Sequence, residues 1–525
     1  MKITRMGKRE RAVEAIRKPV PVMGRVLPED EHNAELVANV HPPGWVNPEP
    51  APRYNLVVVG AGTAGLVTAA GAAGLGARVA LVERHLMGGD CLNVGCVPSK
   101  CLIRSSRAAH DMLDSERYGL GARNGFEPDF PAVMERMRRL RAHMSRHDSA
   151  GRFAGLGVDV FLGDARFSGP AAVEVGGRTL RFAKAVIATG ARAFVPTVPG
   201  LDEAGFLTNE TVFSLTELPK RILVFGAGPL GCELAQAFRR FGSQVTIVER
   251  GPRFLAREDP DAAEVLHDSF RRDGIEVRLG TEVVRVHLSE KGKHALLRKG
   301  GAESECLVDE ILIGAGRIPN VGGLNLEGAG VEFDERTGVR VDDFLRTANP
   351  RIYAAGDVCL PHKFTHTADA AARIVIQNAL FMGRKRLSSL TVPWCTYTDP
   401  EIAHVGMYER EAREAGIETD TFVRHMKDVD RAIADGEEEG FVKIHVRKGT
   451  DEILGATVVA RHAGEMINEI SLAIAGKIGL GKIASVIHSY PTQAEAIRQA
   501  ADAFNRTRLT PFVGKVLRRW LELTR

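Results

Sequence analysis

Two stretches of this chain share one order of apolar and polar positions. Each starts with four apolar residues, LVVV at 56–59 and ILVF at 222–225, followed by Gly-x-Gly-x-x-Gly and a helical segment. A second apolar run then ends in glutamate, and the stretches 56–83 and 222–249 align without a gap. A continuously apolar strand is typical of a parallel sheet buried on both faces. The pattern therefore predicts two βαβ units.

The glycines of each unit are spaced to bind a dinucleotide. Gly60 permits the turn after the strand, Gly62 lets the backbone approach a pyrophosphate, and Gly65 lets the helix pack on the strand. The N-terminus of that helix favours the anion, and Glu83 is expected to hydrogen-bond a ribose hydroxyl. One such motif alone can be a glycine-rich turn, but two in register predict two sites. The second unit supplies the same positions: Gly226, Gly228, Gly231 and Glu249.

The acid of the second unit bears on the choice of nicotinamide dinucleotide. Glu249 would repel a 2′-phosphate, which favours NADH over NADPH. Arg250 and Arg253 stand close by in the sequence and leave NADPH open.

The C-terminal part has a different pattern. From about Thr391, strand-like segments such as Phe441–Val446 and Ile453–Val459 alternate with helical ones such as Glu465–Ile478. This predicts a separate α+β domain of ordinary size. Residues Pro511–Arg525 form a basic amphipathic pattern, which predicts a helix packed against the body, with a membrane surface as the alternative.

The first 53 residues are expected to form an appendage to the folded part of the chain. A helical pattern near Arg9–Arg17 gives way to the proline-rich segment His41–Arg53, which indicates an extended linker. We expect a solvated arm, and docking to another protein is the alternative.

Composition narrows the class of protein. The 525 residues are 44 % apolar and 26 % charged, and the net charge of +4 is too small to indicate nucleic-acid binding. No run approaches the roughly 20 apolar residues of a membrane span, and the basic N-terminus lacks the apolar stretch of a signal peptide. A cytoplasmic protein is therefore expected. Its seven cysteines should not form a structural disulfide framework.

The strongest chemical signal is the segment GGDCLNVGCVPSK, Gly88–Lys100. It holds Cys91 and Cys96 with four residues between them. No second cysteine or histidine pair stands at ligand spacing, so we expect redox chemistry and no metal site. The other cysteines are expected to be packed thiols: Cys101, Cys232, Cys306, Cys359 and Cys395.

This segment resembles the redox-disulfide signature of the class I pyridine nucleotide–disulfide oxidoreductases, which include dihydrolipoamide dehydrogenase, glutathione reductase and mercuric reductase. The resemblance covers about residues 54–505 and includes three further motifs, at 188–190, 316–320 and 352–357. It implies an α/β fold with two Rossmann-like dinucleotide-binding domains, for FAD and NAD, and a C-terminal α+β dimerisation domain.

The resemblance also implies domain bounds. An N-terminal arm and linker spans 1–53, and a first FAD-binding segment spans 54–195. The NAD(P)-binding domain follows at 196–317, a central FAD segment at 318–390, the dimerisation domain at 391–510 and the basic tail at 511–525.

Similarity implies roles for individual residues. Cys96 would be the flavin-proximal, charge-transfer thiol, and Cys91 the interchange thiol that attacks the substrate. Lys100 and Glu233 match a pair beside the flavin, where a cation also lowers the pKa of a thiol. Similarity also assigns Thr189, Gly190 and Asp357 to the FAD site, where Asp357 would bind the ribitol chain. At His366 a helix would aim its positive end at the flavin. Gly316 would belong to the NAD site.

The implied electron path runs from NADH through FAD to the Cys91–Cys96 disulfide. From there the electrons pass to a small-molecule or protein disulfide, or to a thiol-reactive acceptor such as Hg(II).

One position departs from the disulfide-reducing members. They carry His-Pro-Thr-x-x-Glu, whose histidine serves the interchange thiol of the other subunit in a homodimer. Here Tyr490 stands in place of that histidine, while Glu495 is retained. Tyrosine, with a pKa of about 10, is a poor base at neutral pH, and His488 is an alternative base. Mercuric reductases also carry tyrosine here, so the chain resembles that branch.

Other features oppose mercury as the natural acceptor. Neither end carries the paired cysteines that deliver Hg(II), and Glu249 departs from the NADPH preference of that branch. Two alternatives stay open: a dihydrolipoamide dehydrogenase of a lipoyl-protein system, and a flavin-binding docking subunit.

Overall fold

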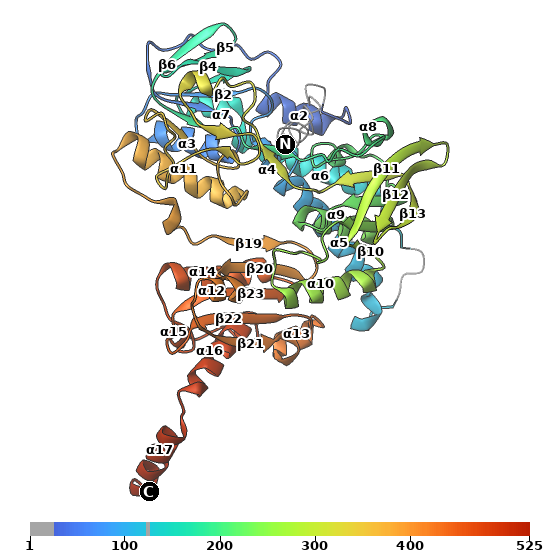
Figure 1. Cartoon of the computed structure of the whole chain (residues 1–525), viewed down its shortest axis with the longest axis vertical. Coiled ribbons are helices and arrows are strands. Elements are labelled where there is room, and N and C mark those ends of the chain that lie inside the picture. The colour runs from blue at the N-terminus through green and yellow to red at the C-terminus, as the bar shows by residue number, and fades with distance from the viewer. Residues whose placement is uncertain (1–25, 122–125) are drawn as a thin grey trace, which may run out of the picture. The chain divides into compact units, whose positions relative to one another are not determined.

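The computed structural model describes residues 26–121 and 126–525 (Figure 1). The chain divides into two compact units, and each is described by itself. The first contains the described residues up to Arg253 together with Gly274–Ser389; the second contains Phe254–Asp273 and Leu390–Arg525. The helix expected near Arg9–Arg17 lies outside the described residues.

The larger sheet of the first unit contains the first predicted βαβ unit. Its parallel strands run in the order β3-β2-β1-β6, and β18 also pairs with β6. Helix α3 (Thr63–Gly74) packs on β1 and β2, and α11 (Thr365–Leu380) packs on α3. The parallel strands are β1 (Tyr54–Val59), β2 (Val79–Glu83), β3 (Val158–Leu162), β6 (Arg178–Ile187) and β18 (Ile352–Ala354).

An antiparallel extension continues this sheet. The N-terminal half of β6 pairs with β5 (Ala172–Val175), which pairs with β4 (Ala165–Gly169). Other helices of this unit are α4 (Gly89–Asn93), α5 (Cys96–Leu113), α6 (Phe130–Ser145), α7 (Ala150–Gly155) and α8 (Leu201–Ala204).

Part of the predicted N-terminal arm packs on this unit. Residues Glu31–Val40 form helix α2, which the sequence pattern did not predict, and Leu36 is fully buried. Arg141 of α6 donates to Asn33 Oδ1 at 2.7 Å. The proline-rich segment that follows has neither helix nor strand, as expected, and Trp45 Nε1 donates to the Val160 carbonyl at 3.1 Å. The described end of the arm is therefore a packed part of the fold and not a solvated extension.

A second parallel sheet of the first unit contains the second βαβ unit. Its strand order is β10-β9-β8-β14, and α9 (Pro229–Phe241) connects β8 to β9. The strands are β8 (Arg221–Phe225), β9 (Gln244–Glu249), β10 (Glu276–Leu279) and β14 (Glu310–Ile313). The predicted repeat is thus confirmed as two separate βαβ units.

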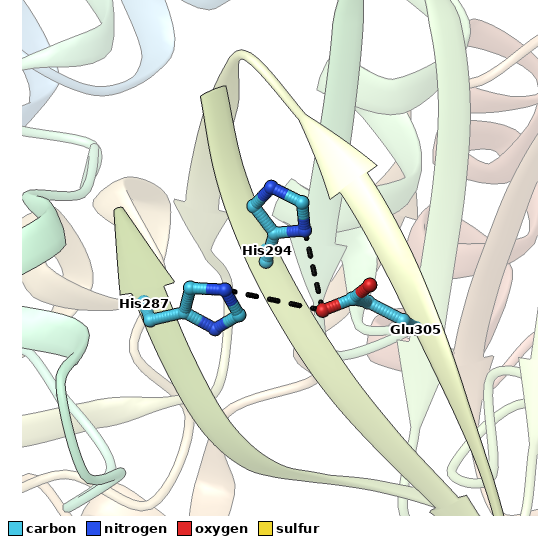
Figure 2. Close-up of side chains that lie close together, drawn as sticks. All are labelled: His287, His294 and Glu305. Carbon is cyan, nitrogen blue, oxygen red and sulfur yellow. Dashed lines mark ion pairs between the residues drawn. The ribbon is translucent and has the colours of Figure 1, made fainter. Parts of the chain in front are cut away.

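A three-stranded antiparallel sheet lies next to it in the chain. It consists of β11 (Thr281–Ser289), β12 (Gly292–Lys299) and β13 (Ala302–Val308), in that order (Figure 2). Val286, Ala295 and Val308 are buried in one core cluster with Leu223 and Ile311 of the parallel sheet. One face of the small sheet is therefore buried, and the alternate side chains point away from that core.

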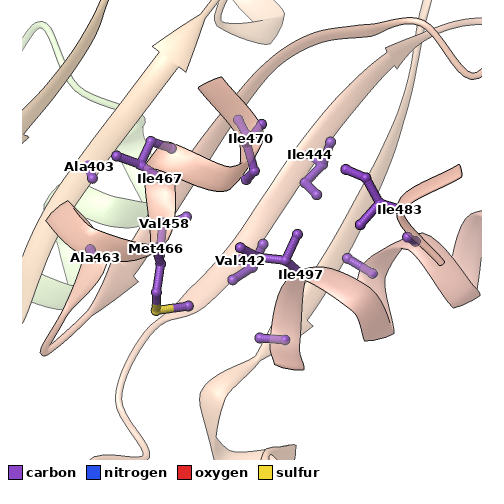
Figure 3. Packing of buried hydrophobic residues seen from close by; sticks show 14 of the residues in the cluster. Ala403, Val442, Ile444, Val458, Ala463, Met466, Ile467, Ile470, Ile483 and Ile497 are labelled. Carbon is purple, nitrogen blue, oxygen red and sulfur yellow. The ribbon is translucent and has the colours of Figure 1, made fainter. Parts of the chain in front are cut away.

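The second unit is the predicted α+β domain. Its sheet has the order β19-β20-β23-β22-β21 with every neighbouring pair antiparallel. Helices α14 (Ala463–Ala475), α15 (Leu480–Ile483) and α16 (Glu495–Thr507) contribute to one apolar cluster with Val442 and Val458 of the sheet (Figure 3). Helix α10 (Pro260–Asp273) also belongs to this unit and contacts β23. The strands are β19 (Pro393–Thr396), β20 (Glu401–Gly406), β21 (Thr419–His425), β22 (Phe441–Arg447) and β23 (Ile453–Ala460).

The C-terminal helix is confirmed, but its expected packing is not. Helix α17 (Pro511–Leu523) buries none of its residues, and Phe512 and Trp520 are 75 % and 64 % exposed. The expectation that it packs against the body of the same chain was therefore wrong. Within the described ranges, no helix combines the length and the apolar character that crossing a bilayer requires.

Candidate active site

The two cysteines lie on consecutive short elements of the first unit. Cys91 is in α4, and Cys96 is the first residue of α5. The first turn of a helix presents unpaired N–H groups and the positive end of the helix dipole, so this position favours a thiolate. The Cys96 sulfur lies 3.3 Å from Oγ1 of Thr365, the first residue of α11. The N-termini of two helices therefore meet at this sulfur.

The two thiols differ in acidity. The hydrogen bond from Cys91 is the largest influence on Cys96 and lowers the pKa of Cys96 to about 6, helped by the Thr365 hydroxyl and the Lys100 charge. The same hydrogen bond, with burial, raises the pKa of Cys91 well above its ordinary value. In the dithiol, Cys96 is therefore the thiolate at neutral pH, and Cys91 keeps its proton.

Lys100 and Glu233 form the ion pair that the resemblance implies. Their Nζ and Oε2 atoms are 2.7 Å apart, with Lys100 one turn after Cys96 in α5 and Glu233 in α9. The Glu233 side chain is 5 % exposed and that of Lys100 is 36 % exposed. A cation thus stands beside the thiolate, anchored by a buried carboxylate.

A second ion-pair chain was not predicted. The Arg317 guanidinium contacts the carboxylate of Asp90, the neighbour of Cys91, and its Nε lies 3.5 Å from Asp357 Oδ2. Burial is the largest influence on Asp357 and raises its pKa. Arg317 belongs to the 316–320 motif and Asp90 to the cysteine segment, but neither was singled out. Arg317 therefore connects the cysteine segment to the expected ribitol-binding aspartate.

Two of the three shorter motifs, at 188–190 and 316–320, are hydrogen-bonded to each other. Thr189 Oγ1 donates to the Asn320 carbonyl at 2.7 Å, and the Gly190 carbonyl accepts from Asn320 N at 2.9 Å. The Gly316 carbonyl accepts from Phe194 N at 2.9 Å. The two motifs, more than a hundred positions apart in the chain, are thus joined by a side-chain hydrogen bond and a backbone hydrogen bond.

The helix at the expected flavin position begins one residue before His366. His366 is exposed and stacks on Phe364 at a centroid distance of 5.3 Å, so its ring lies at the first turn of α11. In the same turn, the buried Thr367 Oγ1 has no hydrogen-bond partner among the described residues. The helix end, together with Thr365, is therefore available to a ligand beside Cys96.

The two glycine motifs have matching geometry. Gly60 and Gly226 have φ of +102° and +100°, which side chains rarely adopt. A Cβ on Gly65 would lie 1.8 Å from the Gly60 carbonyl oxygen, and one on Gly231 would lie 2.4 Å from that of Gly226. Gly62 and Gly228 are the N-caps of α3 and α9. Each motif thus brings a strand end and a helix N-terminus together as a pyrophosphate requires.

The two acids also take matching positions. Glu83 accepts from Ala61 N at 2.7 Å and from His85 N at 2.8 Å. Glu249 accepts from Ala227 N at 3.0 Å and from Gly251 N at 2.6 Å. Burial is the largest influence on Glu83 and raises its pKa. A carboxylate oxygen has two acceptor positions, so both acids can still accept from a ribose hydroxyl. The residues present therefore fit FAD at the first βαβ unit and a nicotinamide dinucleotide at the second βαβ unit.

The residues of the C-terminal motif lie in the second unit. Tyr490 is 69 % exposed and its hydroxyl donates to Asp430 Oδ2 at 2.9 Å, which raises the pKa of Tyr490. Glu495 is 8 % exposed and accepts from Arg498 Nη2 at 2.5 Å.

His488, the alternative base, has a side chain that is 8 % exposed. Its Nε2 lies 2.8 Å from Glu469 Oε1, and its Nδ1 lies 3.1 Å from the Val486 carbonyl. Tyr490 is thus presented to solvent, while both nitrogens of His488 are engaged.

Comparison with known proteins gives the family. The family model described as pyridine nucleotide-disulphide oxidoreductase matches residues 54–374, and its dimerisation-domain model matches residues 392–501. The chain belongs to the pyridine nucleotide–disulphide oxidoreductase family. Its α/β fold with a dimerisation domain, and the family's use of FAD and a pyridine nucleotide, follow from this membership.

Individual relatives include two kinds of enzyme. The chain is 36 % identical over 459 residues to a mercuric reductase of Streptomyces lividans, covering 86 % of this chain and 96 % of that one. It is 35 % identical over 465 residues to a dihydrolipoyl dehydrogenase of Thermus scotoductus, covering 86 % and 98 %. Among solved structures, the HOCl-induced flavoprotein disulfide reductase RclA from Escherichia coli matches with a TM-score of 0.77 and 29 % identity, covering 86 % of this chain and 99 % of RclA.

Proposed function

We propose that this chain is an FAD-dependent NADH oxidoreductase of the mercuric-reductase-like branch. It would pass electrons through the Cys91–Cys96 pair to a disulfide or a thiol-reactive acceptor. The observation that carries the proposal is the arrangement at Cys96, where a thiol of low pKa contacts Thr365 and lies one helical turn from the Lys100–Glu233 pair. Such a thiolate, beside a cation and two helix N-termini, is suited to electron transfer and not to structural packing.

FAD, when bound, supplies the hydride acceptor for the nicotinamide and the two-electron donor for the disulfide. The Gly60 and Gly226 motifs would hold the two pyrophosphates, and Asp357 would hydrogen-bond the ribitol chain. Lys100 stabilises negative charge near the flavin, and Glu233 keeps the ammonium in place. These roles divide cofactor binding and charge stabilisation among residues of the first unit.

The thiols complete the reaction with an acceptor disulfide. Reduction of the Cys91–Cys96 bond by two electrons leaves a Cys96 thiolate and a Cys91 thiol that has taken up one proton. Cys91 loses that proton and attacks one sulfur of the acceptor, which releases the other as a thiolate. Cys96 then attacks the Cys91 sulfur, releases the second half of the acceptor and restores the enzyme disulfide.

The proton on Cys91 decides which acceptors are favoured. Its raised pKa means that attack on a disulfide needs a base. The raised pKa of Tyr490 keeps its hydroxyl protonated at neutral pH, so it cannot accept the thiol proton. Both ring nitrogens of His488 are already bonded, to Glu469 and to the Val486 carbonyl. A soft, thiol-reactive metal ion displaces the thiol proton to solvent as it binds and needs no such base. This supports thiol-reactive acceptors over ordinary disulfides.

We propose that the enzyme is a homodimer in which Tyr490 faces the thiol pair of the partner subunit. The match to the dimerisation-domain model supports this. The second unit also exposes large apolar side chains near Tyr490 in sequence: Leu472, Val486 and Ile487. Exposed apolar residues of this size on one domain favour association with another protein surface.

NADH is the proposed electron donor. The Glu249 carboxylate is fixed by two backbone N–H groups at the end of β9, where a ribose 2′-position is expected. A negative charge fixed there disfavours a 2′-phosphate. A reducing compartment such as the cytoplasm suits this thiol chemistry.

An anaerobic acceptor screen tests the proposal. The FAD-loaded chain is reduced with NADH and offered lipoamide, glutathione disulfide, Hg(II) and quinones, with Cys91→Ser as the matched control. We expect turnover with a thiol-reactive acceptor that the control lacks. Equal turnover by the control with every acceptor would contradict thiol-mediated transfer.

A dihydrolipoamide dehydrogenase is the second candidate. Glu249 and the 35 % identity to the Thermus scotoductus enzyme favour it, and Tyr490 opposes it. Rapid NAD-linked oxidation of dihydrolipoamide at neutral pH would establish it in place of the first proposal.

A further inference from the structure

The outward face of the small antiparallel sheet brings three ligand-type side chains together. His287 on β11 stands directly opposite His294 on β12. Glu305 on β13 pairs with Leu296, two residues along from His294, and therefore lies on the same face. The ligand atoms of the three residues all lie within 4.8 Å of one another, and no other such group of three occurs in residues 26–121 and 126–525 (Figure 2).

The histidine rings are positioned as a pair. Their centroids are 4.6 Å apart and their planes differ by 12°. Nδ1 of His294 lies 3.2 Å from Glu305 Oε1, and Nε2 of His287 lies 4.0 Å from the same oxygen. One carboxylate oxygen therefore faces a nitrogen of each ring.

His294 carries the second observation. Its Nε2 lies 2.9 Å from the Ser289 hydroxyl, which orients the ring. Its Nδ1 is buried and has no hydrogen-bond partner within the described residues, although it lies close to the Glu305 carboxylate. Metal-binding histidines characteristically use one nitrogen for the metal and the other for an orienting hydrogen bond. Ser289 and Glu305 place His294 in that arrangement.

We propose that His287, His294 and Glu305 bind one divalent transition-metal ion of borderline softness, such as Zn²⁺, Cu²⁺ or Ni²⁺. Imidazole and carboxylate ligands suit these ions, whereas Hg(II) and Cu(I) prefer thiolates. Three protein ligands leave a fourth position for water or another ligand.

The distances suit such an ion after small side-chain movements. Bonds of about 2.0–2.2 Å to zinc place neighbouring ligand atoms roughly 3–4 Å apart. The present separations between the ligand atoms are all within 4.8 Å. His287 and Glu305 are 48 % and 55 % exposed, so their rotamers can adjust, while His294 at 17 % stays fixed. Residue spacing alone does not reveal this site because its ligands come from three strands.

Zinc binding to the full FAD-loaded chain tests the proposal. The chain carries Cys91→Ser and Cys96→Ser, so that the thiol pair does not compete for metal. Equilibrium dialysis against Zn²⁺ is compared with the same chain carrying His287→Ala, His294→Ala or Glu305→Gln. His425→Ala, at an exposed histidine on β21, is the matched control.

We expect one Zn²⁺ per chain that each ligand variant weakens by about tenfold or more, with no change in the control. Equal uptake by the parent and His294→Ala would overturn the proposal. So would a parent that takes up no zinc while His294→Ala lowers the melting temperature, because that result identifies an ion pair only.

Electron paramagnetic resonance with Cu²⁺ identifies the ligands. The parent should show hyperfine coupling to two imidazole nitrogens, and His287→Ala should show coupling to one. A copper signal without nitrogen coupling would contradict the assignment.

Discussion

The ammonium of Lys100 lies 2.7 Å from the carboxylate of Glu233, although the two residues are 133 positions apart in the chain. Lys100 lowers the pKa of Cys96 by its charge, and Glu233 raises it. The thiol therefore responds to both members of the pair in opposite directions. The Glu233 carboxylate, on the helix of the second βαβ unit, thus limits the effect of the lysine on the Cys96 thiol.

The ionisation of Cys96 gives a pH prediction. Because its pKa is lowered to about 6, the thiolate of the reduced enzyme is present above that pH and is lost as the pH falls through it. We expect the long-wavelength thiolate–flavin absorption to follow this titration. Lys100→Met should move the midpoint to higher pH, and Glu233→Gln should move it to lower pH. Exposed Lys291→Met is the control, and a midpoint that shifts in the same direction in both variants would contradict the proposed charges.

Tyr490 is expected to decide which acceptors react. Tyr490→His supplies a base that titrates near neutral pH, so NAD-linked oxidation of dihydrolipoamide should rise by about 10²-fold. His488→Gln should leave the low parental rate unchanged because His488 already bonds Glu469 and Val486. Steady-state rates between pH 6 and 9 measure both effects. A fast parental reaction that His488→Gln abolishes would show that His488 is the base.

The glycines of the repeat give a packing prediction. An added Cβ at Gly65 would lie 1.8 Å from the Gly60 carbonyl oxygen, whereas one at Gly74 in the same helix meets nothing within 4 Å. Gly65→Ala should destabilise the fold by about 1–3 kcal/mol and lower the FAD content of the purified protein. Gly231→Ala should instead retain FAD and weaken NADH binding. Gly74→Ala is the matched control, and equal FAD loss in it would refute the packing argument.

Glu249 gives a prediction on cofactor choice. Glu249→Gln removes the charge but keeps an oxygen that accepts from the backbone. The ratio of kcat/KM for NADPH to that for NADH should rise roughly tenfold, since a 2′-phosphate no longer meets a carboxylate. An unchanged ratio would contradict the role proposed for Glu249.

The sequence predicted the features that depend on local pattern. The two βαβ units, with Glu83 and Glu249 bonded to equivalent backbone groups, follow from spacing that the chain itself repeats. In the C-terminal unit, strands β22 and β23 and helix α14 were likewise predicted from apolar periodicity.

Contacts between distant segments were not predictable in the same way. Asp90 and Arg317 are 227 positions apart, and Thr365 reaches Cys96 only through the packing of α11. The cluster of His287, His294 and Glu305 depends on strand register, which no spacing rule gives. Helix α17 was predicted as a helix, but its amphipathic pattern did not reveal that its apolar side chains stay exposed in one chain.

The most direct test is an anaerobic titration of the FAD-loaded protein with NADH, followed by visible absorption in the parent, Cys91→Ser and Cys96→Ser. We predict a long-wavelength band that appears in the parent on two-electron reduction, a band in Cys91→Ser before any NADH is added, because its Cys96 thiolate has no disulfide partner, and no band in Cys96→Ser at any stage. The same band in Cys96→Ser would contradict the assignment of Cys96 as the thiol beside the flavin.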